Sequence, residues 1–404
     1  MQGPGQVGTD NNRRTPLKRV EASIPARYYY DPQHFERELE VFWYNMWVMA
    51  CREEELPNPK DFKVIKIGPQ GIVILRDLEG KLRAFHNTCR HRGSILCTEE
   101  KGTLRGRRIV CPYHAWAYDL DGRLVATPRQ METPDFELGN YTLFQVAIDT
   151  WGGFVFVNLA GEDAGPLSDA LGAMPERFKN YGFPELRIGK RIVMDVKANW
   201  KILFENFSEC FHCPGVHPEL CGIVTAYWEG GAWGLRTDAA GNLAKELSPE
   251  YSPKAVTLTM DGTSHIPPFK GLSEDERKIL YKAQTFRPNF FLNVHPDYVN
   301  SHQMLPTGPE SVRMIYDWLF EVESMRRPDF NLDHYVALWD LTNRQDARNC
   351  EWQQEGLHCR EFTSGIFVPQ EWGCHQFNRW VLETLGELNG RSTIGSRKGS
   401  ATAY

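Results

Sequence analysis

The 404-residue sequence lacks any apolar run near the roughly 20 residues needed to cross a bilayer. Residues 1–16 are polar and lack the apolar core of a signal peptide. We therefore expect a soluble, cytoplasmic protein with no membrane association. A basic excess is also missing, because 46 Lys and Arg stand against 52 Asp and Glu, for a net charge of −6. This balance argues against nucleic acid as a partner, since proteins that bind it usually have a clustered basic face.

Cysteine is sparse, with ten residues in the whole chain. A disulfide-stabilised scaffold is much denser in cysteine, so we expect thiols or metal ligands in a reducing compartment. A nucleotide-binding signature is also lacking. Gly3, Gly5 and Gly8 match the spacing G-x-G-x-x-G, but no strand precedes them and Pro4 interrupts the motif. We interpret this stretch as tail, so any nicotinamide cofactor would act on another protein.

The patterns that are present change along the chain. Residues 27–50 carry apolar residues at helical spacing, and residues 62–158 contain short β-branched runs, with a hairpin signal at Asp121-Gly122. Further on, strands are expected over 191–198 and 311–322, and helices over 199–209 and 333–357. We predict an α+β protein with the following parts: a flexible tail (1–24), a helix belonging to the second domain (25–50), a small all-β domain (51–165), a second domain (166–388) and a disordered tail (389–404).

The all-β domain contains two Cys-His pairs, Cys89-x-His91 and Cys111-x2-His114, separated by 19 residues. A zinc finger normally takes its cysteines from one segment and its histidines from another. Here each of the two loops supplies one cysteine and one histidine. This arrangement suits a two-iron cluster with two cysteines on one iron and two histidines on the other, whose potential is about −150 to +300 mV.

A second group of possible ligands lies in the segment "ENFSECFHCPGVHPEL", residues 205–220. An open mononuclear iron site uses two histidines and one carboxylate, and His212 and His217 supply the histidines. The Pro-Gly pair at 214–215 is expected to break a helix there, so that His217 folds back beside His212. A zinc site on Cys210 and Cys213, spaced C-x2-C, is the alternative. We read these cysteines as small buried residues.

The third ligand is expected on helix 333–357, which offers five acids: Asp333, Asp340, Asp346, Glu351 and Glu355. Asp346 falls on one helical stripe with Trp339, Thr342, Cys350, Gln353 and Leu357. Asp340 falls on a charged stripe with Arg344, Arg348 and Glu351. We therefore expect Asp346 to point inward.

The motifs "CRHRG", "CPYHAW" and H-x4-H together resemble the Rieske non-haem iron oxygenases, large (alpha) subunit, over residues 25 to 390. Ala115 departs from the glycine usual in the family. The resemblance implies a Rieske domain and a catalytic domain in which an antiparallel sheet packs against helices, of helix-grip type. It also implies a [2Fe-2S] cluster on Cys89, His91, Cys111 and His114, and Fe(II) on His212, His217 and Asp346.

The same resemblance implies further partners. O2 is the co-substrate, NAD(P)H supplies electrons through a separate flavin- or ferredoxin-type reductase, and a homotrimer places each Rieske domain beside its neighbour's iron. Glu209 would link His212 to the partner subunit's His114, and Asn206 would lie beside the iron. A pure electron carrier would lack the second iron site, and a structural zinc protein would bind no iron.

The finer assignment rests on Glu209, where the family usually has Asp. With "ECFHCPGVHPEL" it resembles the branch of carnitine and glycine betaine monooxygenases, which are N-demethylases. This favours monooxygenation of a small organic molecule with N- or O-dealkylation. The alternative is an aromatic-ring cis-dihydroxylating dioxygenase alpha subunit. A cationic substrate would favour aromatic walls, for which the candidates are Tyr227, Trp228, Trp233, Phe286 and Phe290.

Overall fold

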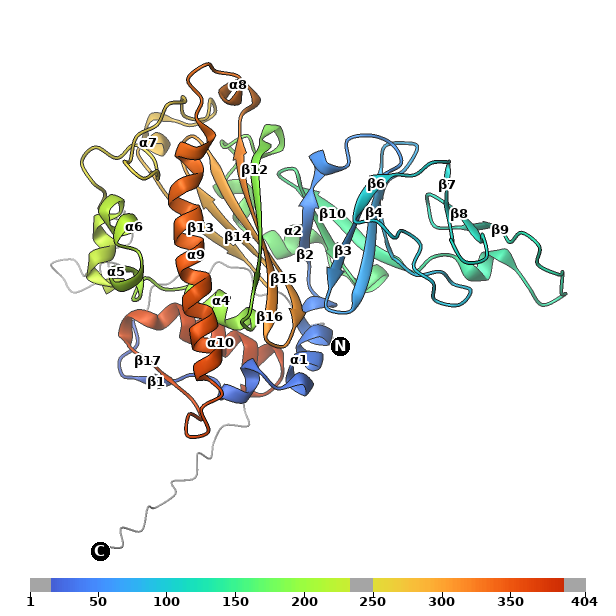
Figure 1. Cartoon of the computed structure of the whole chain (residues 1–404), viewed down its shortest axis with the longest axis horizontal. Helices are drawn as coiled ribbons and strands as arrows, with labels where there is room; N and C mark the ends of the chain where they lie inside the picture. The colour runs from blue at the N-terminus through green and yellow to red at the C-terminus, as the bar shows by residue number, and fades with distance from the viewer. Residues whose placement is uncertain (1–15, 233–249, 389–404) are drawn as a thin grey trace, which may run out of the picture.

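The computed structural model describes residues 16–232 and 250–388 (Figure 1). The expected tail 389–404, residues 1–15 of the other tail, and Trp233 lie outside the described residues. Residues 16–24 are not wholly tail, because Glu21–Ala22 (β1) pairs with Ile366–Phe367 (β17). The described part confirms the α+β prediction, with one sheet-rich domain beside a domain of sheet and helices.

The first domain is built on a seven-stranded sheet and a three-stranded sheet. The larger has the order β2-β11-β10-β5-β4-β3-β6 and the smaller β7-β8-β9. Every pairing is antiparallel, and Gly122 (φ 93°) makes the predicted turn between β8 and β9. The strands are β2 (Val48–Arg52), β3 (Asp61–Ile67), β4 (Gln70–Arg76), β5 (Leu82–His86), β6 (Lys101–Thr103), β7 (Arg108–Val110), β8 (Ala117–Asp119), β9 (Leu124–Ala126), β10 (Gln145–Trp151) and β11 (Phe154–Asn158).

The second domain is a five-stranded antiparallel sheet in the order β12-β16-β15-β14-β13, with the long helix α9 in front of it (Figure 1). Its strands are β12 (Arg187–Val196), β13 (Lys282–Phe286), β14 (Phe290–Val294), β15 (Val299–Gly308) and β16 (Ser311–Phe320). The described α-helices are α1 (Pro32–Glu38), α2 (Leu167–Leu171), α3 (Met174–Arg177), α4 (Trp200–Asn206), α5 (Cys213–Val216), α6 (Pro218–Ile223), α7 (Glu274–Arg277), α8 (Val322–Met325), α9 (Leu332–Gly356) and α10 (Trp372–Thr384).

The helix expected over 25–50 is shorter than predicted. The chain forms a 3-10 turn at Ala26–Tyr29, then α1, which a π-helical turn at Leu39–Trp43 extends. Residues Val48–Arg52 are the strand β2, and all five are buried against β11. The run is apolar on both faces, so helical spacing does not distinguish it from a buried strand. The predicted domain boundary at residue 51 therefore falls inside β2.

Successive side chains of β15 point to opposite faces of the second sheet, and the two faces make different contacts. His302 and Met304 face α4 and α9, and Gln303 faces the first domain, where its side-chain amide donates to the carbonyls of Met49 and Ala50. Asn289 adds two hydrogen bonds to the backbone of Met49, at 2.9 Å each. We call the contact of β2 and its neighbour β11 with the second sheet the domain seam.

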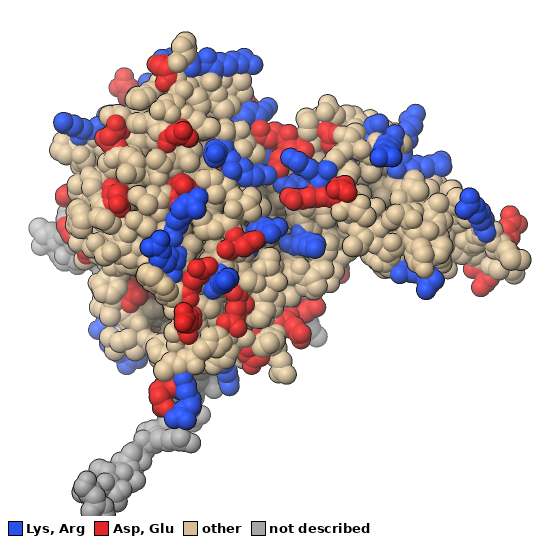
Figure 2. All heavy atoms as spheres, viewed as in Figure 1, with Lys and Arg blue, Asp and Glu red and all other residues tan. Residues whose placement is uncertain are grey.

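The surface is mixed in charge. On the face in Figure 2, Lys and Arg lie beside Asp and Glu over both domains. In the described part of the chain, no helix is long and apolar enough to cross a membrane.

Candidate metal centres and active site

Two loops at the tip of the first domain bring the predicted cluster residues together. Cys89 and His91 follow β5, and Cys111 and His114 lie between β7 and β8. The two cysteines are buried, at 3% and 2% exposed, and neither forms a disulfide. The imidazoles lie further out, with ring centroids 4.7 Å apart. The site thus has two thiols inside and two imidazoles toward the surface.

Neighbouring side chains hold these loops in place. The ring of His91 stacks on Trp116 at 4.7 Å, and the hydroxyl of Tyr118 lies 3.3 Å from Cys89 Sγ. Ala115 adopts φ 59°, a left-handed conformation that costs a non-glycine residue about 1–2 kcal/mol. This conformation explains why glycine suits the position.

The donor set fits a [2Fe-2S] cluster better than a single ion. Two thiols and two imidazoles on facing loops are the ligands of a Rieske centre. Among the described residues, the group found compact enough for one ion is a different set, described next.

The second group consists of His212, His217 and Asp346, whose ligand atoms all lie within 4.8 Å of one another. Asp346 Oδ1 is 2.8 Å from His217 Nε2 and 3.4 Å from His212 Nε2, and the two rings are nearly perpendicular. Two imidazoles and one carboxylate converging in this way fit the facial set of a non-haem iron site. The cysteines of the C-x2-C alternative are not part of this compact group.

The local fold of the histidine segment differs in one respect from the expectation. Helix α4 already ends at Asn206, and His212 is the residue before the short helix α5, with His217 directly after it. Pro214 therefore lies in the first turn of a helix, where proline is well tolerated, instead of breaking one. The outcome for the two rings is the same, because one turn of α5 brings them together.

Each imidazole is oriented through its Nδ1 atom. His212 Nδ1 donates to Glu209 Oε1 at 2.5 Å, and His217 Nδ1 donates to Gln345 Oε1 at 2.7 Å. Gln345 Nε2 in turn donates to Glu219 at 3.3 Å. These bonds fix the proton on Nδ1 and leave Nε2 free to bind a metal.

The charges of the three groups favour a cation between them. Burial disfavours a charged His212, but hydrogen bonds to Asp346 and Glu209 outweigh it and raise its pKa to about 10. Burial would raise the pKa of Asp346, but its bonds to the two imidazoles hold that pKa well below the usual range. The group thus attracts a proton that a divalent metal would replace.

The other predicted residues lie close to this group. Asn206 Nδ2 donates to Asp346 Oδ1 at 3.1 Å, so Asn206 is beside the expected metal position. Glu209 accepts from the backbone of Phe211 and His212 as well as from the His212 ring. Helix α9 carries Asp346 on the expected face, although at its C-terminal end Gln353 is exposed and Gln354 is buried instead.

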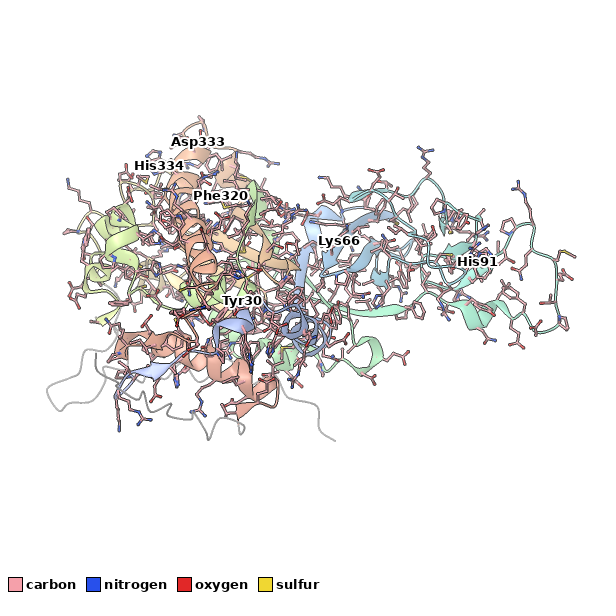
Figure 3. All side chains as sticks on the ribbon, turned by 60° about the horizontal axis from the view of Figure 1, so that its bottom comes forward. Tyr30, Lys66, His91, Phe320, Asp333 and His334 are labelled. Atoms are coloured by element: carbon pink, nitrogen blue, oxygen red, sulfur yellow. The ribbon has the colours of Figure 1, made fainter. Side chains whose placement is uncertain are left out.

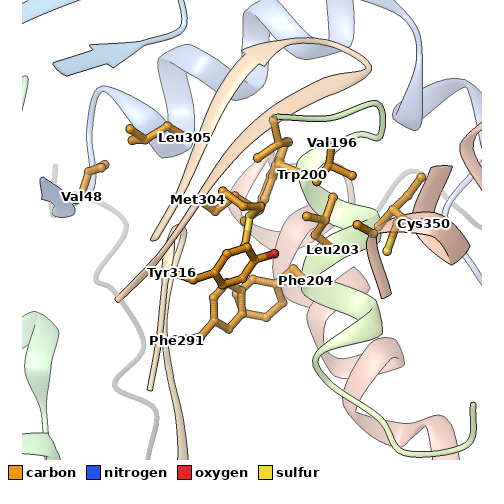
Figure 4. Close-up of a cluster of buried hydrophobic side chains, with 14 of the residues drawn as sticks. Val48, Val196, Trp200, Leu203, Phe204, Phe291, Met304, Leu305, Tyr316 and Cys350 are labelled. Carbon is orange, nitrogen blue, oxygen red and sulfur yellow. The ribbon is translucent and has the colours of Figure 1, made fainter. Parts of the chain in front are cut away.

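A small cavity of about 40 Å³ adjoins Asp346, between α4, α9 and the sheet. Figure 4 shows Leu203 and Phe204 of α4 facing Tyr316 and Phe291 of the sheet, which form the apolar wall behind it. The cavity is lined by Leu203, Asn206, Phe207, Phe291, His302, Met314, Tyr316, Asn343, Asp346, Ala347 and Cys350.

The predicted aromatic residues that the structure describes, Tyr227, Trp228, Phe286 and Phe290, are not those at the cavity. Phe286 and Phe290 pack on Phe156 and Phe154 across the domain seam, at centroid distances of 5.1 Å and 4.8 Å. Tyr227 is buried in the main core, and Trp228 is 51% exposed. The aromatic rings at the cavity come instead from Phe207, directly after α4, and from Phe291 and Tyr316 of the sheet. Proximity in sequence to His212 and His217 therefore does not predict which aromatic residues line the cavity.

Several site residues gave no signal in the sequence. Gln345, Glu219, His302 and Asn343 are polar residues of ordinary type, without metal-ligand spacing. Gln345 directly precedes Asp346, and this adjacency is the one feature of the sequence that indicates a place near the site. The role of His302 depends on which face of β15 it occupies, which alternation alone leaves open.

The two candidate metal-binding groups lie far apart within one chain. In Figure 3, His91 is near the far end of the first domain, while His334 of α9 is in the second domain at the opposite end. The same separation is visible in Figure 1 between β7–β9 and α5.

Comparisons with known proteins agree with this architecture. The family profile described as "Ring hydroxylating alpha subunit (catalytic domain)" matches residues 183–387, and the profile "Rieske [2Fe-2S] domain" matches residues 46–137. The chain is 28% identical over 403 residues to the glycine betaine monooxygenase oxygenase subunit of Pseudomonas aeruginosa (strain UCBPP-PA14), covering 93% of this chain and 92% of that one. It is also 28% identical over 382 residues to the chloroplastic choline monooxygenase of Atriplex hortensis, covering 92% and 80%.

A solved structure of the quaternary ammonium Rieske monooxygenase CntA, in complex with an inhibitor, superposes with a TM-score of 0.72. It covers 95% of this chain and 99% of that one at 22% identity, and so shows the same fold. Fold and sites thus define an oxygenase that combines an iron–sulfur cluster with a mononuclear iron. The chain belongs to the Rieske non-haem iron oxygenases, as a large (alpha) subunit, and the predicted resemblance is confirmed.

Proposed function

We propose that the chain is the oxygenase component of a monooxygenase that removes a methyl group from a quaternary ammonium compound. In this proposal His212, His217 and Asp346 hold Fe(II), and Cys89, Cys111, His91 and His114 hold the [2Fe-2S] cluster. The observation that carries the proposal is the convergence of two Nε2 atoms and one carboxylate at a cavity with aromatic walls. Iron held there supplies activation of O2.

The side chains around the iron position prepare it for this role. Glu209 and Gln345 hold the Nδ1 protons of both imidazoles and so leave both Nε2 atoms available to a metal, and Asn206 donates to one oxygen of Asp346. The rings of Phe207, Phe291 and Tyr316 form the aromatic part of the cavity wall. They also offer π faces to a cation.

The substrate class is proposed from the relatives and from these rings. Glycine betaine and choline, named in the relatives described above, are both quaternary ammonium compounds. An N-methyl group, O2, two electrons and two protons give an N-hydroxymethyl group and water. The N-hydroxymethyl compound then releases formaldehyde and a proton, leaving the tertiary amine.

Electrons are proposed to come from NAD(P)H through a separate flavin- or ferredoxin-type reductase. Within one chain the cluster loops and the iron position lie at opposite ends of the molecule (Figure 1). We therefore propose a homotrimer in which a cluster reduces the iron of its neighbour. Glu209, hydrogen-bonded to His212, would receive the partner subunit's His114 and join the two centres.

The test combines spectroscopy with product analysis. The dithionite-reduced protein is mixed with nitric oxide and examined by EPR, alone and with quaternary amines, aryl ethers or plain arenes. We expect signals from both iron centres, a change in the nitrosyl signal with quaternary amines, and one formaldehyde per turnover. A nitrosyl signal altered only by arenes, with cis-diol products, would contradict the proposal and favour the dioxygenase alternative.

A further inference from the structure

The two loops that carry the predicted cluster ligands are closed in different ways. The loop with Cys111 and His114 joins β7 to β8, which pair with each other, and the N–H of Cys111 donates to the carbonyl of Trp116 at 2.8 Å. The loop with Cys89 and His91 leaves β5 and leads to β6, and these two strands are not neighbours in the sheet. Pairing of its flanking strands therefore cannot close this loop.

The side chain of Asn87 closes it instead. Its Oδ1 atom accepts from the N–H groups of Leu96 at 3.2 Å and Cys97 at 2.9 Å, and its Nδ2 atom donates to the carbonyl of Cys97 at 2.8 Å. Asn87 is 7% exposed, and the two residues that it bonds are 6% exposed each. In the described part of the chain, no other hydrogen bond links residues 95–97 to residues 86–88. Because buried backbone groups need partners, these three bonds fix the returning part of the loop.

The loop is also anchored to the sheet at Asn87. The N–H of Asn87, directly after β5, donates to the carbonyl of Gly71 on β4 at 2.8 Å. Inside the loop, the N–H of Cys89 donates to Ser94 at 2.8 Å, and the N–H of Gly93 donates to Cys89 at 3.0 Å. Residues 87–97 thus form one closed unit, and Asn87 connects both of its ends to the sheet.

The position of this unit determines a contact between the two cluster loops. The hydroxyl of Tyr118, on β8, lies 3.3 Å from Cys89 Sγ and accepts from the N–H of Arg90 at 3.1 Å. Because its oxygen accepts from Arg90, the hydroxyl proton can point at the sulfur. A hydrogen bond to a ligand sulfur stabilises the reduced cluster, which has one more negative charge, and so raises its reduction potential.

We propose that Asn87 is a positioning residue for the [2Fe-2S] cluster, because it holds Cys89 and His91 opposite the second loop. This inference rests on the proposed function and deepens its cluster assignment. Asn87 acts through the backbone of residues 95–97 and needs no contact with the cluster.

The test compares release of the cluster to an iron chelator from the natural protein, Asn87→Leu and Asn87→Asp, followed by the Rieske absorbance. Leu has no polar atom in its side chain, whereas Asp still accepts from Leu96 and Cys97. We expect release about 10- to 100-fold faster in Asn87→Leu, and within about threefold of the natural rate in Asn87→Asp. Circular dichroism checks that each variant is folded.

The midpoint potential provides a readout that a general loss of stability does not change. We expect a lower potential for the cluster that Asn87→Leu retains, because its bond from Tyr118 is weakened. Asn158→Leu is the matched control. Asn158, on β11 of the same sheet, is 2% exposed, and its amide also bonds to the backbone, at Ala160 and Asn45. This control should change neither the release rate nor the potential.

Equal release rates and potentials in Asn87→Leu and Asn158→Leu overturn the inference. Release from Asn87→Asp as fast as from Asn87→Leu overturns it too, because the shared hydrogen bonds would then not hold the loop. Hydrogen exchange in the natural protein needs no variant. The N–H groups of Leu96 and Cys97 should exchange more slowly than that of Ile95, which donates to no described residue, and equal rates contradict the inference.

The natural protein separates the two possible failures. If it shows no Rieske signal, the cluster assignment of the proposed function fails, and the inference fails with it. A normal Rieske signal with unaltered Asn87 variants overturns the inference alone.

Discussion

At the scale of single residues, the two imidazoles of the candidate iron site differ in what orients them. His212 donates to the carboxylate of Glu209, and His217 donates to the neutral amide of Gln345. Residues in such positions typically affect metal affinity as strongly as they affect activity. The orientation of His217 therefore depends on Gln345, an uncharged residue whose position in the sequence does not mark it as part of a metal site.

Replacement of Gln345 by Leu removes the acceptor of His217 Nδ1 and the link to Glu219. We expect the affinity for iron to fall by about 10- to 100-fold, with little change in the iron–sulfur absorption. Competition with a ferrous chelator measures this affinity. The exposed Gln353→Leu variant is the control, and equal iron retention in both variants would contradict the role given to Gln345.

Glu205, next to Asn206 in sequence, gives a prediction about pH. Burial raises its pKa to about 7 from 4.5, against hydrogen bonds from Tyr29 and Asn378 that favour the carboxylate. Between these two values the folded protein holds one proton more than the unfolded chain, so the stability contributed by this group falls as pH rises and is lost above about 7.

The variant Glu205→Gln keeps an oxygen that accepts from both Tyr29 and Asn378 but cannot titrate. We expect its free energy of unfolding, relative to the natural protein, to rise by up to about 3 kcal/mol between about pH 5 and about pH 8. Urea denaturation followed by circular dichroism at several pH values measures the difference. A difference independent of pH would show that Glu205 titrates normally.

Residue types with restricted chemistry were predictable from the sequence, and ordinary polar residues were not. Cys89 and His91 stand out because cysteine and histidine at short spacing have few other uses. His302 and Asn343 meet at one cavity only after β15 and α9 pack together, and the 40 residues between them hide the pairing. The metal-binding roles themselves stay predictions.

At the scale of elements, periodicity predicted long regular segments and failed where two patterns overlap. Helix α9 and strands β12 and β16 were expected and are present. The segment ending in β2 has apolar residues suited to both a helix and a buried strand, and pairing with the distant β11 decides the outcome. Likewise, whether Pro214 starts or ends a helix depends on the chain that follows it.

Helices α1 and α4 are joined by a buried ion pair. Lys201 Nζ lies 2.6 Å from Glu38 Oε1, both side chains are 0% exposed, and Trp200 Nε1 donates to the other carboxylate oxygen. Removing one partner of a buried pair leaves an unpaired charge, which typically costs 3–5 kcal/mol, whereas removing both charges costs much less.

We therefore expect Lys201→Met to lower the free energy of unfolding by about 3–5 kcal/mol. The double variant Lys201→Met with Glu38→Gln is expected to recover most of this loss, because Gln still accepts from Trp200. Urea denaturation of both variants measures the effect. A double variant as unstable as the single one would show that packing, and not the unpaired charge, is responsible.

At the scale of the whole molecule, the separation of the two centres gives a prediction about mixed assemblies. A His91→Ala subunit would lack a working cluster, and a His212→Ala subunit would lack the iron. We expect each variant alone to be inactive. Mixed oligomers from co-expression should regain part of the activity, because an intact cluster then faces an intact iron in a neighbouring subunit.

Formaldehyde release by the mixed oligomers, purified through a different tag on each variant, measures this recovery. A mixture of the two variants purified separately, and never allowed to exchange subunits, is the control. Complete inactivity of the mixed oligomers would mean that electrons pass within one chain, and the proposed arrangement of subunits would be wrong.

The domain seam also limits how relatives of this enzyme can be recombined. Met49 of β2 is held by Asn289 and Gln303, residues that lie more than 200 positions further along the chain. Phe154 and Phe290 fill the same seam from opposite sides. The cluster-bearing domain therefore cannot be exchanged between relatives as an independent unit. A functional chimera must inherit β2, β11, β14 and β15 from one parent, even if its cluster loops and its substrate cavity come from two.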